Sequence, residues 1–251
     1  KTTIIAAFVA ALKELGIKTI LLAPTGRAAK VLSHYSGADA FTIHKRIYRE
    51  RTMADYESKF SLDYNKEKGA IFIVDEASML SSTSSDEATF GSGNLLEDLI
   101  TYVRSGKECR LLLVGDNAQL PPVGADYSPA LDESVMQGYG DVMYASMDDV
   151  VRQDVDSGIL FNATMLRCMI ESDIEEVPQF DMHFPDFEAI GGLDIMEKLQ
   201  DAYDKYGGDE TIIITRSNKR ANRYNEGVRR YNLSAEEAIE SGDRLMVVRN
   251  N

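Results

Sequence analysis

The chain has 251 residues, of which 44% are apolar and 27% charged, values that are ordinary for a soluble globular protein. This length fits one large domain or two small ones with a substantial core. The 27 basic and 41 acidic side chains give a net charge of −14. That balance argues against a protein that coats nucleic acid with a basic surface, although a narrow groove would need only local positive charge.

Sorting signals are not evident in the sequence. No apolar run reaches the roughly 18 residues that a membrane span needs. The amino terminus has helical spacing followed by charged Lys13 and Glu14, so we interpret it as a helix and not as a secretory signal. Cys109 and Cys168 are too few for a disulfide framework. We therefore expect reduced thiols, a cytoplasmic location and no membrane partner.

Strand and helix patterns alternate along the chain, which favours an α/β fold. Glycines follow several of the expected helices and would end them. The expected strands are 18–23, 70–74, 110–114 and 211–215, and the expected helices are 2–15, 25–35, 43–51, 94–103, 157–171, 193–206 and 217–231.

Two polar segments interrupt this pattern. Residues 81–93 are rich in Ser, Gly and Thr and are interpreted as a loop. Residues 171–192 are polar and acidic and contain Pro178, Pro185 and a Gly pair, which favours an interlobe linker. The boundaries predicted from this pattern are a first lobe over 1–170, the linker over 171–192 and a second part over 193–251.

Two expected strands that are apolar throughout are each followed by polar residues that could act in a reaction. Such strands are usually buried on both faces of a parallel sheet, and ligands bind beyond their carboxyl ends. The first strand runs into Asp75, which could hold a magnesium ion, and Glu76, which could polarise a water. The second runs into the string Gly-Asp-Asn-Ala-Gln-Leu-Pro-Pro-Val-Gly, in which Gln119 could sense a terminal phosphate. Together they indicate a nucleoside triphosphate-driven motor.

Three other short motifs in the first half of the chain carry weaker signals. Lys1 and Thr2 open a helix, as the end of a phosphate-binding loop would, or as any helix start. Thr25 follows a strand at a helix start, where it could hold a phosphate or simply cap the helix. His44 could contact a base or a phosphate, or pack against the sheet.

Two further candidates lie in the second half of the chain. Arg152 could stabilise the charge of a transferring phosphoryl group, or form a surface salt bridge. Asn218 sits after the expected strand 211–215, where a nucleic-acid strand could lie, or it caps the helix that follows.

In this order, the motifs resemble superfamily 1 helicases of the RecD-like group, the group that includes the exonuclease V alpha subunit. The match includes Lys1-Thr2, Ala23–Ala29, Thr42-Ile43-His44, Asp75–Ser78 and Gly115–Gly124, and Arg152-Gln153 resembles the family's fourth motif. The resemblance implies a RecA-like P-loop NTPase sheet with flanking helices, plus the beginning of a second RecA-like lobe, with ATP between the lobes.

The resemblance also implies a role for each candidate residue. Lys1 would contact the terminal phosphates, and Thr2 and Asp75 would bind Mg²⁺. Glu76 would act as the base, Gln119 would couple the phosphate to lobe movement, and Arg152 would stabilise the transition state. Thr25, His44 and Asn218 would touch single-stranded DNA. Because the Gly-rich half of the phosphate loop is not in this sequence, we expect weak hydrolysis by the chain alone.

The main hypothesis is therefore part of an ATP-dependent DNA helicase that moves 5′ to 3′ on single-stranded DNA in repair or recombination, with exonuclease V companion subunits as candidate partners. A non-catalytic nucleic-acid-binding module that keeps the fold is one alternative. An RNA helicase or a relaxase-linked helicase domain is another.

Overall fold

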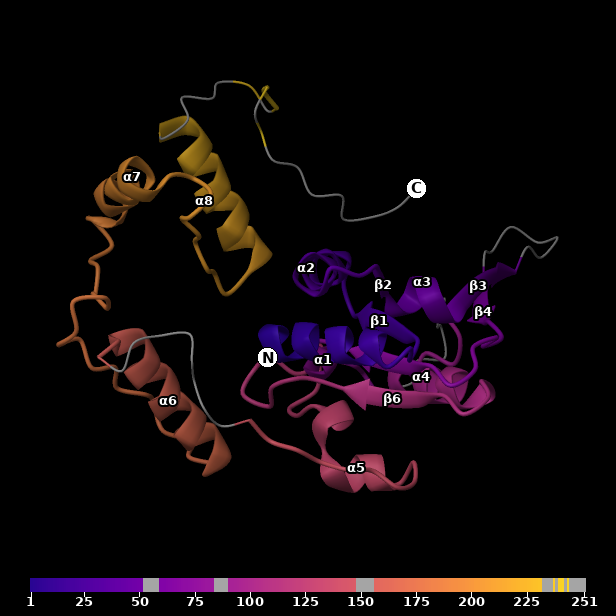
Figure 1. The fold of residues 1–251 in the computed structure, drawn as a ribbon. Helices are drawn as coiled ribbons and strands as arrows, with labels where there is room; N and C mark the ends of the chain where they lie inside the picture. The colour runs from indigo at the N-terminus through magenta and orange to yellow at the C-terminus, as the bar shows by residue number, and fades with distance from the viewer. Residues whose placement is uncertain are drawn as a thin grey trace. The chain divides into compact units, whose positions relative to one another are not determined.

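The computed structural model describes residues 1–51, 59–83, 90–147, 156–231, 237, 239–241 and 243. The chain forms two compact units, residues 1–150 and residues 151–251 (Figure 1). Each unit is described by itself. In the described residues, no helix is both long and apolar enough to cross a membrane.

The first unit is built on a four-stranded parallel sheet. Its strands are β1 (Thr19–Ala23), β2 (Ala40–Thr42), β5 (Ile71–Val74) and β6 (Arg110–Leu113), in the spatial order β2-β1-β5-β6. β1 and β5 lie in the middle, and after their first residues both are apolar and buried, so both of their faces are covered. This arrangement confirms the predicted α/β class with a parallel sheet and flanking helices.

Helices cover both faces of this sheet. Neighbouring residues of a strand point to opposite faces, so each central strand packs against helices on both sides. Leu21 and Ile73 pack in one apolar cluster with α1 (Thr2–Glu14) and α2 (Gly26–Ser36). Leu22 and Phe72 pack in a second cluster with α3 (Ile43–Ile47) and α4 (Leu95–Ser105). The sheet is therefore the middle of three layers.

A two-stranded antiparallel hairpin, β3 (Tyr48–Arg51) paired with β4 (Lys59–Leu62), follows α3. The predicted helix over 43–51 is wrong in its second half. Ile43 and Ile47 have helical spacing and are fully buried, so α3 forms. From Tyr48 onward the backbone instead pairs with residues 59–62, a non-local contact that local spacing does not reveal.

A cluster of short elements follows β5 and β6. They are the 3₁₀ turns η1 (Ala77–Met79) and η2 (Pro129–Leu131) and the helix α5 (Glu133–Gln137). Asp132 caps α5, because its carboxylate accepts the Val135 N–H at 2.9 Å.

The second unit contains the helices α6 (Gly158–Glu171), α7 (Ile195–Tyr206) and α8 (Asn218–Tyr231). The strand predicted over 211–215 does not form in the structure. Its apolar side chains Ile212 and Ile214 are 74% and 88% exposed, and a single extended segment gains no ladder hydrogen bonds. The predicted domain boundaries, including the linker over 171–192, remain a prediction.

An ion cluster fastens the amino-terminal edge of the sheet in the first unit. The Glu67 carboxylate contacts Lys18 Nζ at 2.6 Å and the Arg46 guanidinium at 2.5 Å. The hydrogen bond from Lys18, opposed by burial and helped by Arg46, lowers the pKa of Glu67 below its ordinary value of 4.5. The loop that contains Glu67 is thereby tied to β1 and α3.

This depressed pKa predicts a pH dependence of folding. A carboxyl group with a lowered pKa in the folded state stabilises the fold above its unfolded pKa, and this contribution disappears as the pH falls through the folded pKa. Glu67→Gln should therefore cost about 1–3 kcal/mol at pH 7 and progressively less below about pH 4.5. Urea melts at several pH values measure this difference. The control Glu14→Gln, at an exposed position in α1, should show no such trend.

Candidate nucleotide site

The four parallel strands end at one edge of the sheet, and the predicted site residues of the first unit follow those ends. Parallel strands bind ligands at this edge. Thr25 follows β1, His44 follows β2, Asp75 and Glu76 follow β5, and Gln119 follows β6. The topology therefore gathers at one edge residues that are far apart in the sequence.

The centre of this edge is a contact between Lys1 and the two acids after β5. The Lys1 ammonium lies 3.1 Å from Asp75 Oδ1 and 2.9 Å from Glu76 Oε1. Asp75 is the most buried of the three, with 8% of its side chain exposed, against 19% for Lys1 and 30% for Glu76. Burial acts to lower the pKa of Lys1, but the hydrogen bonds and charges of Glu76 and Asp75 outweigh it and raise that pKa. Lys1 is therefore firmly cationic at neutral pH.

Glu76 has an unusual backbone conformation. Its φ is +55°, in the left-handed region that non-glycine residues rarely adopt. Its N–H donates to Asp75 Oδ1 at 2.9 Å, and the next N–H, of Ala77, donates to the Val114 carbonyl at 3.0 Å. The turn is thus fixed to the end of β6, and non-glycine residues held in sparsely populated conformations cluster at functional sites.

The start of α1 supplies positive polarity beside this acidic pair. The carbonyl of Lys1 accepts the N–H groups of Ile4 and Ile5 at 3.1 Å, so the helix begins directly after Lys1, at Thr2. The first turn of α1 contains no acidic residue. A helix amino terminus with an adjacent lysine suits phosphate groups, and a carboxylate beside them suits Mg²⁺. The donor set present here therefore fits a magnesium nucleotide.

The loop after β6 is closely packed where it begins and exposed where it ends. A side chain at Gly115 would lie 2.9 Å from the Ser78 backbone nitrogen and 2.6 Å from Leu131, so only glycine fits there. Asp116 then folds the turn, accepting the Ala118 N–H on its side chain and the Gln119 N–H on its carbonyl. The Gln119 side chain is exposed, and Leu120 after it is 84% exposed. Close packing therefore explains why the motif has glycine at position 115. No packing contact explains why it has glutamine at position 119.

Thr25 and His44 have local structural roles at this edge. Thr25 caps α2, because its hydroxyl accepts the Ala28 N–H at 3.2 Å, and it stays exposed. The His44 ring is half-buried and lies against Tyr48 and Phe90, with centroids 5.6 and 5.1 Å away. Burial lowers the pKa of His44, so the ring is neutral at pH 7. These contacts match the structural alternatives for both residues, and their DNA contacts remain predictions.

Arg152 and Asn218 belong to the second unit. Arg152 lies outside the described residues. Asn218 is exposed in the second unit, and the cap of α8 is Ser217, whose hydroxyl accepts the Arg220 N–H at 3.3 Å. The alternative in which Asn218 merely caps the helix is therefore wrong. The backbone of Thr2 opens α1 as predicted.

A buried polar network behind His44 escaped the sequence analysis. The Tyr48 hydroxyl donates to Asp98 Oδ2 at 2.7 Å, and the Ser92 N–H donates to the same oxygen at 3.0 Å. Burial and the Asp98 carboxylate strongly raise the pKa of Tyr48, so the hydroxyl stays protonated. Only the acidic residue within the apolar spacing of α4 could have indicated this network.

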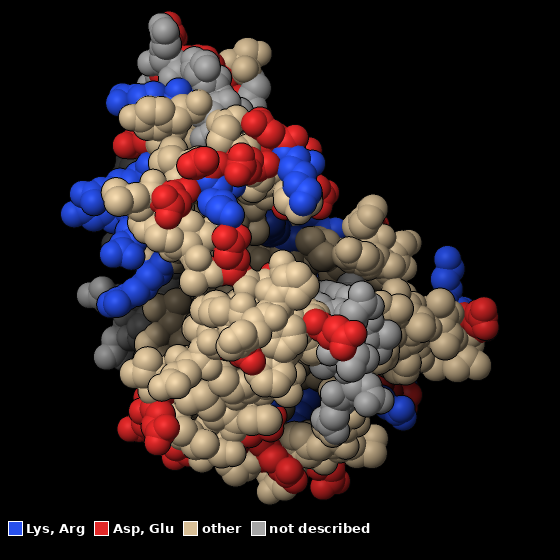
Figure 2. Space-filling model, turned by 90° about the vertical axis from the view of Figure 1, so that its left-hand side faces the viewer, with Lys and Arg blue, Asp and Glu red and all other residues tan. Residues whose placement is uncertain are grey.

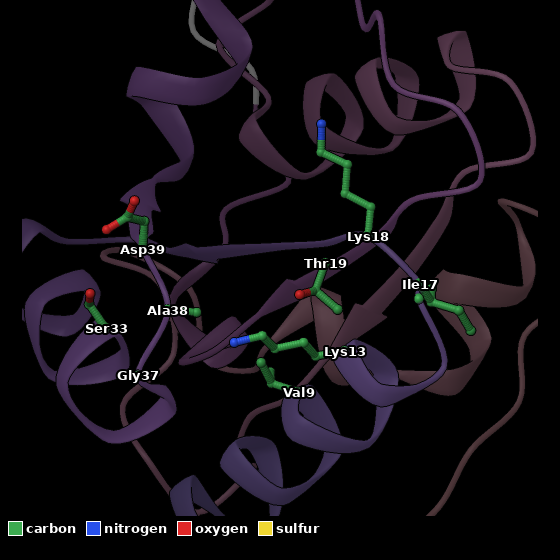
Figure 3. A pocket seen from close by; sticks show the side chains of 10 residues that line it. Val9, Lys13, Ile17, Lys18, Thr19, Ser33, Gly37, Ala38 and Asp39 are labelled. Atoms are coloured by element: carbon green, nitrogen blue, oxygen red, sulfur yellow. The ribbon is translucent and has the colours of Figure 1, made fainter.

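A shallow cavity of about 640 Å³ lies at the opposite edge of the sheet (Figure 3). It is lined by α1, the start of β1, the end of α2 and the segment before β2, including Lys13, Thr19, Ser33 and Asp39. None of the predicted site residues lines it, so it is separate from the acidic pair at the carboxyl ends of the strands.

The parallel sheet, the acidic pair after a buried strand and the lysine at a helix start together define an α/β P-loop NTPase fold of the RecA-like kind. Residues 1–167 match the family model described as an AAA domain, and the chain belongs to this family. It is a helicase-like nucleotide-binding domain.

Two relatives extend this assignment. The chain is 33% identical to the ATP-dependent RecD2 DNA helicase of Deinococcus radiodurans over 113 residues. This match covers 45% of the chain and 13% of that helicase. Over 140 residues, 50% of this chain and 11% of the relative, the chain is 36% identical to an uncharacterised protein of Methanocaldococcus jannaschii. The predicted resemblance to RecD-like helicases is therefore confirmed. The matched segments are small fractions of both relatives.

Proposed function

We propose that this chain is part of an ATP-dependent DNA helicase that couples ATP hydrolysis to 5′–3′ movement on single-stranded DNA, in DNA repair or recombination. The observation that carries the proposal is the Lys1 ammonium held between Asp75 and Glu76 at the carboxyl end of β5. The similarity to a DNA helicase supports a helicase function over other nucleotide-dependent functions.

In this proposal each residue of the edge has one task. Asp75 and Thr2 hold Mg²⁺, and Lys1 binds the terminal phosphates of ATP. Bound Mg²⁺ would offset phosphate charge. Glu76 accepts a proton from water, which its partly exposed carboxylate allows. Gln119, exposed after β6, responds to the terminal phosphate, and Arg152 offsets charge on the transferring group.

The nucleic-acid contacts are assigned to Thr25, His44 and Asn218. Thr25 and Asn218 are exposed, and His44 presents a half-buried neutral ring. Contacts to phosphates and stacked bases need little base reading, so we expect low sequence specificity. Exonuclease V companion subunits remain candidate partners. Cys109 and Cys168 are both free thiols, in keeping with a cytoplasmic location.

The test is ATP hydrolysis by the full-length protein with and without single-stranded DNA. DNA-stimulated hydrolysis is expected, and RNA should stimulate it less. Absence of hydrolysis both with and without DNA would favour the non-catalytic nucleic-acid-binding module. Stronger stimulation by RNA would favour an RNA helicase.

Arg152→Ala provides a separate test of the transition-state role. Because a transition-state contact is absent in the ground state, we expect the hydrolysis rate to fall by about 10²–10³-fold while the affinity for ATP changes little. Steady-state hydrolysis and equilibrium nucleotide binding measure the two quantities. A loss of affinity at an unchanged maximal rate would remove Arg152 from this role.

A further inference from the structure

Positive charge is concentrated in and just before α8, although the whole chain carries −14. Between residues 216 and 230 the only acidic residue is Glu226. The basic residues of this segment are Arg216, Lys219, Arg220, Arg223, Arg229 and Arg230. Figure 2 shows many Lys and Arg side chains in its upper part, together with acidic ones.

The helix has a packed side and a basic side. Val228 is 8% exposed, and Ala221 and Tyr224 are half-buried on the same side. At 100° per residue, Lys219, Arg223 and Arg230 lie on the opposite side and are exposed. We call these three residues the α8 basic stripe. With a rise of 1.5 Å per residue, the stripe is about 16 Å long.

Ion pairing within the described residues does not account for the stripe. Arg229, beside it, donates to both carboxylate oxygens of Asp243 at 2.9 and 2.8 Å, and this pair is structural. Among the described residues, no salt bridge involves Lys219, Arg223 or Arg230. Like charges four residues apart, as at 219 and 223, destabilise a helix by a few tenths of a kcal/mol. The stripe is therefore suited to an external polyanion.

We propose that the α8 basic stripe binds consecutive phosphates of single-stranded nucleic acid. A backbone with one phosphate every few ångströms presents several phosphates along about 16 Å. Lys and Arg contacts to phosphates release counterions and carry little sequence information. The ligand rests on the proposed function, and the inference extends the nucleic-acid contacts from Asn218 along the exposed side of α8.

The test is a salt titration of the full-length protein binding fluorescent oligothymidylate, read by anisotropy without nucleotide. For single strands the slope of log affinity against log salt is about −0.7 per phosphate contact. In the triple variant K219Q/R223Q/R230Q the slope should therefore become less negative by about 2. Its affinity at 0.1 M salt should fall by about 100-fold. The charge-preserving variant K219R/R223K/R230K should keep both, and K198Q/K205Q, which removes two cations from α7, should change neither.

The outcomes separate this inference from the proposed function. An unchanged slope in the triple variant would contradict phosphate binding by the α8 basic stripe, even if DNA stimulates ATP hydrolysis. A wild-type protein that does not bind the oligonucleotide also overturns it. Binding that depends on the α8 basic stripe, without DNA-stimulated hydrolysis, would support phosphate binding by the stripe. It would contradict the proposed ATP-dependent helicase function. Circular dichroism melts of all variants establish that the fold is kept.

Discussion

Glu76→Gln in the full-length protein is expected to abolish ATP hydrolysis while leaving nucleotide binding largely intact. Glutamine keeps the size of the side chain but cannot accept a proton, and loss of a general base costs about 10²–10⁴ in rate. Lys1 would keep its contact with Asp75, 3.1 Å away, and would still be available to phosphates. Single-turnover hydrolysis and equilibrium binding of a fluorescent nucleotide measure the two effects.

The matched control for this variant is Asp39→Asn, which removes a carboxylate from the opposite edge of the sheet. Its hydrolysis rate should equal that of the wild type. Near-normal turnover in Glu76→Gln would exclude Glu76 as the base. Loss of binding together with turnover would instead assign Glu76 to holding the nucleotide.

Gly91→Ala should produce the largest loss of stability among single methyl additions in the first unit. Gly91 has φ +51°, and an added Cβ would lie 2.0 Å from Asp98 Oδ2 and 2.5 Å from Tyr48 Cε1. The methyl group would therefore break the buried hydrogen bond between Tyr48 and Asp98 as well as strain the backbone. We expect a loss of about 3–5 kcal/mol, measured by urea unfolding.

Gly16→Ala separates these two causes. Gly16 has φ +70°, but no atom lies within 4 Å of an added Cβ. It should lose only the cost of left-handed backbone strain, about 1–2 kcal/mol. Equal losses in the two variants would show that the polar network contributes little.

The central part of the fold could be predicted from the sequence because its signals are local. β1 and β5 are continuous apolar runs, and α2 and α4 begin at residues whose side chains cap them, Thr25 and Asn94. β2 was missed because three residues give no periodicity. β3 and β4 were missed because their pairing is non-local.

The candidate site was predictable in its location and less so in its contacts. Buried parallel strands place whatever follows them at one edge, which is why Asp75 and Gln119 could be expected there. The two ion pairs of Lys1 and the left-handed backbone of Glu76 depend on how α1 packs on the sheet. The cap at Ser217 in place of Asn218 depends on where α8 starts, a boundary that propensity places only to within a residue or two.

The order of the strands has a mechanical consequence. β1, which leads to Thr25, is hydrogen-bonded directly to β5, which leads to Asp75, and β2, which leads to His44, is the next strand along. Neighbouring strands lie about 4.8 Å apart. A displacement at the end of β5 therefore reaches Thr25 through one hydrogen-bonded ladder and His44 through two. Within this unit, a stiff sheet could pass motion sideways over about 10 Å without any long chain of intervening side chains.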